Sequence, residues 1–202
     1  VQSIKDGNAV TSVAVVGHDY QGMKPTMAVK VGDRVKLGQV LFSDKKIEGV
    51  HFTAPAAGIV QEINRGARRV FQSLVITLDG DESEQFAQYD VAALSGLSAE
   101  QVEENLVNSG MWTALRTRPF SKTPKPGSRP SAIFISAMDT TPLCADPAVV
   151  IAEQSEAFEN GLAVLDRLAE GKVFVGKAPG ASIPTGKATV TEFGGVHPAG
   201  NV

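Results

Sequence analysis

The sequence is poor in cysteine, and this scarcity excludes several kinds of site. Cys144 is the single cysteine among 202 residues, so no disulfide can form within the chain. A cluster of thiolates that holds an iron–sulfur centre or a structural zinc ion is excluded for the same reason. One unpaired cysteine is typical of a protein that works in a reducing compartment.

Long apolar runs and an excess of one charge are also lacking. No apolar run approaches the roughly 18 residues that predict a membrane-spanning helix, and no signal peptide is recognised at the start. The net charge is −3, which excludes a general electrostatic attraction to nucleic acid. With 43% hydrophobic and 20% charged residues, the composition is that of a soluble globular protein with one large or two small domains.

Motifs that carry catalytic chemistry are lacking as well. The stretch 180–187 is similar to a phosphate-binding loop, but five residues instead of four separate Gly180 from Gly186. No glycine-rich dinucleotide fingerprint follows a predicted strand, and no serine or cysteine lies in a nucleophile motif. The three histidines lie far apart in the sequence. The chain alone is therefore predicted to be a binding module and not a catalyst.

The sequence does contain a repeat between residues 29 and 78. The arm at 29–42 recurs 34 positions later, at 63–76, so that Gly32 meets Gly66 and both arms end in an apolar triplet. Each arm predicts a short strand, a turn in which glycine takes a positive φ, and a second strand of large apolar residues.

This repeat resembles the biotinyl/lipoyl carrier domains, which have the barrel-sandwich hybrid fold. Those domains show a V-x-V-G-D-x-V-x-x-G-Q-x-L arm and an A-P-x-x-G step. The matching residues here are Val29, Val31, Gly32, Asp33, Val35, Gly38, Gln39, Leu41, Ala54, Pro55 and Gly58. The carriers are modified on a lysine at a hairpin tip, and the tip at 43–49 offers Lys45 and Lys46 without a flanking methionine. A solvated charged turn is the favoured interpretation of this tip.

The signals change in character after residue 79, where turn residues end the last predicted strand. An acidic connector at 82–94 follows. We therefore predict a barrel-sandwich hybrid β domain at residues 1–95 and a Rossmann-like α/β domain at 96–202, with the flexible boundary between them.

Helix and strand signals in the second domain follow the order of an α/β fold. The predicted elements are a helix at 98–110, a strand at 132–137, one long helix at 146–171, and strands at 172–175 and 189–193. Ser98 and Gln101 form a capping box, and Asp146 before Pro147 is typical of a helix start. A strand, a helix and a strand in this order predict a parallel pair with a right-handed crossover.

A basic loop at residues 111–130 separates the first helix from the first strand of this domain, and its four prolines exclude a long helix. The candidate functional side chains in it are Trp112, Arg116, Arg118, Phe120 and Lys122. Two interpretations stay open. The loop is either a solvated positive segment or a surface for a partner or an anion, where arginine pairs with carboxylates or phosphates and aromatic side chains act as anchors.

Several runs together resemble the A subunit of the bacterial sodium-translocating NADH:quinone oxidoreductase. They are GMKPTM (22–27), FTAP (52–55), EINRGA (62–67), SGMWTALRTRPFSK (109–122), AMDT (137–140) and HPAG (197–200). The resemblance covers nearly the whole chain, and the run at 109–122 is its most specific part. Because the family's members are longer at both ends, the chain is expected to be a fragment.

The resemblance implies a peripheral subunit on the cytoplasmic face of the bacterial inner membrane. The complex oxidises NADH, reduces ubiquinone and pumps Na+. It implies no cofactor bound by this chain, with NADH, FAD, FMN and Fe–S centres on other subunits. The implied partners are those subunits, especially the membrane-embedded B subunit, and ubiquinone as the substrate of the complex. The resemblance also implies a role in quinone binding, for which the basic loop is our candidate.

The second domain is similar, more distantly, to the flavin-binding subunit of respiratory complex I and to the C subunit of Rnf complexes. Their loop reads S-G-x-x-G-x-G-G-A-G-F-P. Here the later glycines are replaced by Thr113, Leu115, Arg116 and Arg118. Side chains at these places should block a flavin, so we predict a degenerate flavin-binding loop. The alternatives are an Rnf-type flavin enzyme, or a carrier domain fused to an α/β domain with Lys45 or Lys46 modified.

Overall fold

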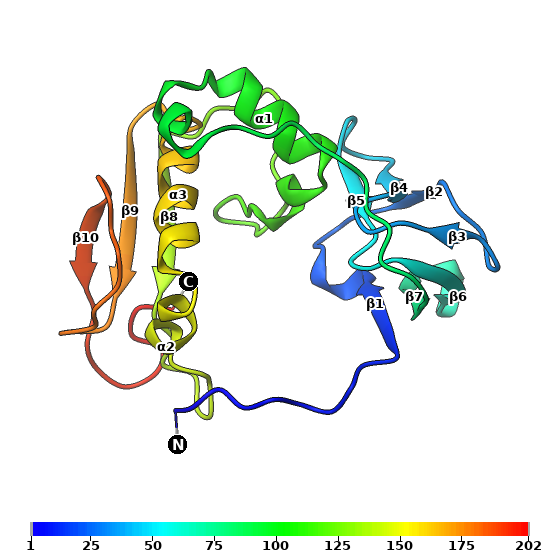
Figure 1. Ribbon diagram of the computed structural model, residues 1–202, viewed down its shortest axis with the longest axis horizontal. Coiled ribbons are helices and arrows are strands. Elements are labelled where there is room, and N and C mark those ends of the chain that lie inside the picture. The colour runs from blue at the N-terminus through cyan, green and yellow to red at the C-terminus, as the bar shows by residue number, and fades with distance from the viewer. Residues whose placement is uncertain (1, 202) are drawn as a thin grey trace. The chain divides into compact units, whose positions relative to one another are not determined.

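The chain folds into two compact units, and each is described by itself (Figure 1). The computed structural model describes residues 2–201. What we call the β unit comprises Asn8–Gln88 and Glu103–Ser128, and the α/β unit comprises Val1–Gly7, Tyr89–Val102 and Arg129–Val202. Residues 111–128 of the basic loop therefore group with the β unit. The domain boundary near residue 95 stays a prediction.

Antiparallel strands form two sheets in the β unit, as a barrel-sandwich hybrid requires. The first sheet has the order β1-β7-β6-β3 and the second the order β2-β4-β5. The strands are β1 Ser12–Val16, β2 Pro25–Met27, β3 Arg34–Val35, β4 Val40–Asp44, β5 His51–Thr53, β6 Gly58–Arg65 and β7 Phe71–Leu78. Short 3-10 turns lie at η1 Gly17–Asp19 and η2 Ala67–Arg69. The predicted fold of this part is confirmed.

The two predicted arms differ at their turns. Residues 29–31 form no strand, because the backbone N–H of Lys30 donates to the Asp33 carboxylate at 2.9 Å and closes a turn there. Gly32 has the expected positive φ of 93°. Gly66 does not, since its φ is −90° and Arg68 takes the left-handed conformation instead, at φ 55°. The prediction of a glycine-dependent turn was therefore wrong for the second arm.

The core of the β unit gathers the apolar residues of both arms. Phe42 stacks on Phe52 with ring centroids 4.7 Å apart and meets the edge of Phe71 at 5.1 Å. Leu41, Phe42, Leu74 and Ile76 are fully buried. Burying one such side chain stabilises a fold by about 1.5–3 kcal/mol, so the apolar triplets of the two arms account for much of the stability of this unit.

Three parallel strands form the sheet of the α/β unit in the order β10-β9-β8. The strands are β8 Ala132–Ala137, β9 Lys172–Lys177 and β10 Thr189–Glu192. The other elements of the second half of the chain are η3 Val91–Gly96, α1 Ala99–Asn108, η4 Met111–Ala114, α2 Pro147–Ala152 and α3 Ser155–Asp166. The predicted strands and their parallel pairing are confirmed.

One long helix was predicted at 146–171, but the structure divides it into α2 and α3. Its start is as expected, because the Asp146 side chain accepts from the backbone N–H of Ala148 at 2.9 Å. Gln154 leaves the helical region at φ −136° and ψ 44°. The Ser155 hydroxyl donates to the carbonyls of Ile151 and Ala152, a competing bond that is known to bend helices. The α3 helix ends at Asp166, before Gly171.

The core of the α/β unit lies between α3 and one face of the sheet. Leu162 of α3 packs against Val173 and Val175 of β9, and Phe158 joins the same cluster. Because side chains alternate along a strand, Phe174 projects from the opposite face of the sheet.

Candidate functional site

The basic loop begins where α1 ends. Ser98 and Gln101 cap the start of α1 with reciprocal hydrogen bonds, which confirms the capping box. At the other end, Gly110 has φ 80°, and a Cβ there would lie 2.4 Å from Thr53 Oγ1. Thr53 Oγ1 donates to the Ser109 carbonyl at 3.0 Å. Glycine is thus required both by conformation and by close approach, and the loop is fixed to β5.

Trp112 is a support of the loop and not an exposed anchor. Its side chain is 3% exposed, and the indole Nε1–H donates to the Pro124 carbonyl at 2.9 Å. This bond joins two points of the loop that are twelve residues apart. Buried indole N–H groups normally have such a partner, and here the partner fixes the loop's path.

Arg116 is also held by the β unit. Its guanidinium donates to the carbonyls of Thr113, Leu115 and Asp19, the last two at 3.0 and 3.1 Å. The same group lies 5.3 Å from the centroid of the Tyr20 ring, a cation–π contact. The Tyr20 ring in turn meets the edge of Phe52 at 4.6 Å. Arg116 therefore covers the outer end of an aromatic column that runs into the core.

The tip of the loop, residues 118–121, is closed at its base and exposed above it. Thr117 donates to the Lys122 carbonyl from its backbone N–H at 2.8 Å and from its hydroxyl at 2.9 Å. Phe120 is 71% exposed. Arg118 is exposed, and it makes no hydrogen bond or ion pair within the part of the chain that the structure describes. The tip thus presents one cation and one aromatic ring to solvent.

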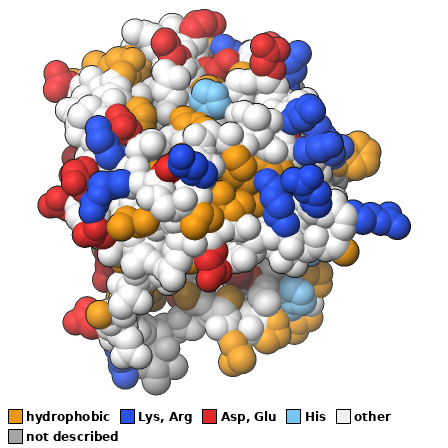
Figure 2. Space-filling model, turned by 90° about the vertical axis from the view of Figure 1, so that its right-hand side faces the viewer, with side chains coloured by type: hydrophobic (Ala, Val, Ile, Leu, Met, Phe, Trp, Pro, Cys, Tyr) orange, Lys and Arg blue, Asp and Glu red, His pale blue; other side chains and the backbone are white. Residues whose placement is uncertain are grey.

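Lys46, from outside the loop, and Lys122 at the base of the tip extend this basic surface. Lys46 Nζ donates to the Gly22 carbonyl at 2.6 Å, and Lys122 Cε lies 3.9 Å from where a Cβ of Gly22 would be. Figure 2 shows Lys and Arg side chains gathered on one part of the visible face, beside a band of hydrophobic side chains. We call Lys46, Arg116, Arg118, Phe120 and Lys122 the basic face. Four of these residues were candidates from the sequence of the loop, whereas Lys46 was a candidate only for carrier modification.

The hairpin tip with the two candidate carrier lysines is ordered by Asp44. This carboxylate is 7% exposed and accepts from the backbone N–H groups of Lys24 at 3.2 Å and Lys46 at 2.9 Å. Lys45 is exposed, whereas the amine of Lys46 is engaged as described above. No contact here favours a modified lysine over a solvated turn.

The carboxyl end of β8 is the place where α/β folds commonly bind ligands. Here Gly200 and Asn201 of the same chain occupy this position. Asn201 Oδ1 accepts from the backbone N–H of Thr140 at 3.0 Å, and Asn201 Nδ2 donates to Asp139 Oδ1 at 3.0 Å. A Cβ on Gly200 would lie 2.2 Å from Met138 Sδ, so the segment approaches as closely as glycine allows.

Asp139 lies two residues beyond the end of β8, in the AMDT run at 137–140. Its Oδ1 accepts from the backbone N–H of Thr141 at 2.8 Å. This bond, the Thr141 hydroxyl and the Asn201 amide hold the pKa of Asp139 below its usual value. This carboxylate therefore closes the turn at Thr141 and holds Asn201, which is 62 positions away in the sequence.

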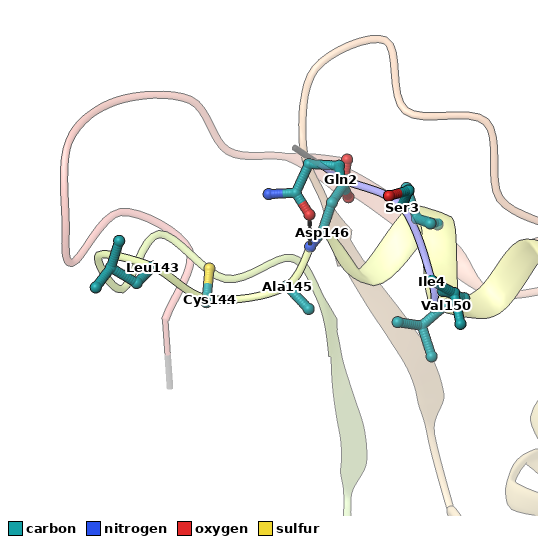
Figure 3. A pocket seen from close by; sticks show the side chains of 9 residues that line it. Gln2, Ser3, Ile4, Leu143, Cys144, Ala145, Asp146 and Val150 are labelled. Carbon is teal, nitrogen blue, oxygen red and sulfur yellow. Dashed lines mark hydrogen bonds between the residues drawn. The ribbon is translucent and has the colours of Figure 1, made fainter. Parts of the chain in front are cut away.

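A shallow hollow of about 340 Å³ lies beside the start of α2 (Figure 3). The Gln2 side chain accepts from the backbone N–H of Asp146 at 2.9 Å at its edge. Cys144 Sγ lies 3.1 Å from the Asp139 carbonyl oxygen. The side chains that line the hollow are mostly small or aliphatic, and Asp146 is the one charged residue among them. Among residues 2–201, no group of three or more His, Cys, Asp or Glu side chains could hold a metal ion, and no helix is long and apolar enough to cross a membrane.

Comparison with known proteins assigns both parts of the chain. Residues 1–79 match the NqrA N-terminal barrel-sandwich hybrid domain, and residues 97–202 match the NqrA second alpha/beta domain. The chain belongs to the NqrA family. This assignment agrees with the antiparallel β unit and the parallel α/β sheet described above.

Full-length relatives of this NqrA-family chain are much longer than it is. A protein of Cellvibrio japonicus, named as the A subunit of a Na(+)-translocating NADH-quinone reductase, is 62% identical over 99% of the chain and 45% of the relative. Proteins of the same name from Pseudomonas aeruginosa and a Marinomonas species are 62% and 60% identical over similar shares. The chain thus spans less than half the length of these relatives.

Proposed function

We propose that this NqrA-family chain is part of a peripheral subunit of a complex that oxidises NADH, reduces ubiquinone and pumps Na+. The observation that carries the proposal is the identity of about three residues in five, along almost the whole chain, with proteins named as the A subunit of such a reductase. Its partners are then the other subunits of the complex, especially the membrane-embedded B subunit. Its place is the cytoplasmic face of the bacterial inner membrane.

The role proposed for this chain is docking or quinone access, through the basic face. The support is that some side chains of the loop are held by the β unit while others are exposed. Trp112 and Arg116 are engaged by the β unit, whereas Arg118 and Phe120 project from a closed tip into solvent. Arginine and aromatic side chains often dominate binding at interfaces, and a tip whose base is fixed loses little freedom on binding.

We also propose that the chain binds no redox centre of its own. The support lies in the loop that aligns with the flavin loop of the distant relatives. Arg116 occupies one of its glycine positions, and its guanidinium is engaged by three carbonyls and the Tyr20 ring. The purified full-length protein should be colourless. A stoichiometric flavin spectrum would contradict this proposal.

The test of the docking role uses the complex assembled with the full-length protein. Arg118→Glu combined with Phe120→Asp should lower the share of complex that retains this protein, or the NADH:quinone turnover, by about tenfold or more, since a loss of 1.4 kcal/mol is a factor of ten. The matched control is Lys30→Glu with Val31→Asp, another exposed basic and apolar pair of the β unit. Equal effects of the two double variants, or none from either, would refute the role of the tip.

The carrier alternative is tested on the same material. A biotinyl or lipoyl mass increment on the peptide that contains Lys45 and Lys46, in protein from its native host, would favour that alternative. An unmodified peptide agrees with the proposal above.

A further inference from the structure

The sheet of the α/β unit carries phenylalanines on the face opposite α3. Phe134 of β8 and Phe174 of β9 pair in register, and their rings stack with centroids 5.1 Å apart at an angle of 12°. Residues on either side of Phe174 pack toward α3, so the stacked rings project from the other face. Phe134 is 69% exposed, so within the described residues most of this side chain is left uncovered despite its contact with Phe174.

Phe193 extends the aromatic surface along β9. A Cβ added to Gly176 would lie 3.2 Å from the Phe193 ring. Gly176 is two residues beyond Phe174 and shares its face, so the ring of Phe193 lies over the bare backbone of this face. Phe193 is 43% exposed. We call Phe134, Phe174 and Phe193 the phenylalanine face.

An open face of this kind is unusual for a parallel sheet. All-parallel sheets occur almost only where both faces are covered, because the crossover connections place helices on them. Here β8, β9 and β10 are all parallel, and α3 packs on one face only. An exposed pair of stacked phenylalanine rings is the surface that a second layer would bury.

The strand order indicates which connection would cover the phenylalanine face. The connection from β8 to β9 carries α3 on one face, and the chain then moves to β10 in the same direction. Crossovers between parallel strands are right-handed in nearly all cases. A connection that moves back across the sheet, toward the free edge of β8, must therefore lie on the opposite face. That face is the phenylalanine face.

We propose that the phenylalanine face is the docking site for a helix from the part of the longer protein that these residues do not cover. The relatives are more than twice as long as this chain, whose residues match the N-terminal barrel-sandwich hybrid domain and the second alpha/beta domain. A helix with an apolar stripe from that part, leading to a strand beside β8, would cover the three rings. The proposal concerns the fold of the full-length protein and does not rest on the docking or quinone role.

The first test leaves the sequence unchanged. Hydroxyl-radical footprinting of the isolated full-length protein measures the oxidation rate of each phenylalanine by mass spectrometry. Phe120 is the internal reference, because it is the same residue type with a similar exposed fraction, 71% against 69% for Phe134. Phe134 and Phe174 should oxidise at least about tenfold more slowly than Phe120. Equal rates at Phe134 and Phe120 would overturn the proposal.

The second test identifies the occupant. The photo-reactive benzoylphenylalanine replaces Phe134 in the full-length protein, and the cross-linked peptides are sequenced after irradiation. The expected product is an internal cross-link to a residue outside 1–202. A covalent dimer would indicate a second copy, and a cross-link only to residues 1–202 would indicate another part of this region. Either result, or no cross-link together with rapid oxidation of Phe134, refutes the proposed occupant.

Discussion

The two units bury their side chains in different ways. Among residues 2–201, eight large side chains are fully buried, and all but Val175 belong to the β unit. In the β unit, two antiparallel sheets supply opposite walls of one core. In the α/β unit, a single sheet has one covered face and one face with exposed rings. Within the residues described, the β unit therefore buries the inner faces of both its sheets, whereas the α/β unit buries one face of its sheet and leaves the other exposed.

The largest effect should come from opening the core of the β unit. Phe42→Ala removes a ring that contacts both Phe52 and Phe71, and truncation of a buried phenylalanine costs about 3–5 kcal/mol. Urea unfolding of the full-length protein measures this loss. Phe120→Ala is the control, expected within about 0.5 kcal/mol of wild type. A loss of unfolding free energy as small as that of the control would contradict a central place for Phe42 in the core.

The junction between α1 and the basic loop should be nearly as sensitive. Gly110→Ala forces a positive φ on alanine and drives its methyl group into Thr53, with an expected loss of about 2–4 kcal/mol from strain and crowding together. Gly127→Ala shares the positive φ, 85° against 80°, but meets nothing within 4 Å. Its loss should be limited to about 1 kcal/mol. Thermal unfolding of the two variants separates crowding from backbone strain, and identical melting temperatures would argue against a close contact with Thr53.

Replacing Arg116 should lower the stability of the fold, whereas replacing Arg118 should affect only assembly or turnover. Arg116→Ala removes three carbonyl contacts and the stacking on Tyr20, so we expect a loss of about 1 kcal/mol, discounted for its exposure to solvent. Arg118→Ala should leave the melting temperature within about one degree and act only on assembly or turnover. The structure thus distinguishes two arginines that the sequence grouped together as candidate residues of one basic loop. A destabilising Arg118→Ala would contradict it.

The smallest expected effect concerns Asp139 in the α/β unit. Hydrogen bonds from Thr141 and Asn201 lower the pKa of this carboxyl in the folded state. Its contribution is therefore present above the unfolded-state pKa, about 3.9, and is lost as the pH falls through the lower folded-state value. The melting temperature of Asp139→Asn should lie slightly below that of wild type at pH 7, and the gap should close toward pH 3. A gap that widens in acid would reverse the sign and refute this assignment.

Sequence patterns predicted best what neighbouring residues determine. The capping box of Ser98, the cap at Asp146 and the parallel pair at 132–137 and 172–175 depend on local composition and spacing, and all are confirmed. The strand near 189–193 is confirmed as well, and the structure adds that it is also parallel. The bend at Ser155 was missed because the apolar spacing continues across it, while the bond that bends the helix comes from a single hydroxyl.

Contacts between residues that are far apart in the sequence could not be predicted from its patterns. Arg116 and the Asp19 carbonyl are separated by 97 positions, and no periodicity links them. Trp112 was a candidate anchor for a partner because it lies among prolines and arginines, yet the fold already buries it within the loop. The role of the basic face stays a prediction.

The burial of Trp112 also makes the chain its own spectroscopic reporter. It is the one tryptophan in the 202 residues, and its indole is shielded from water and bonded to Pro124. Its emission in this part of the protein should accordingly be shifted to the blue and be quenched little by iodide. A ligand that breaks the bond between Trp112 and Pro124 would shift the emission to longer wavelength. A ligand that binds only the tip at 118–121 would leave the emission unchanged. Fluorescence thereby distinguishes a ligand that rearranges the loop from one that only covers it.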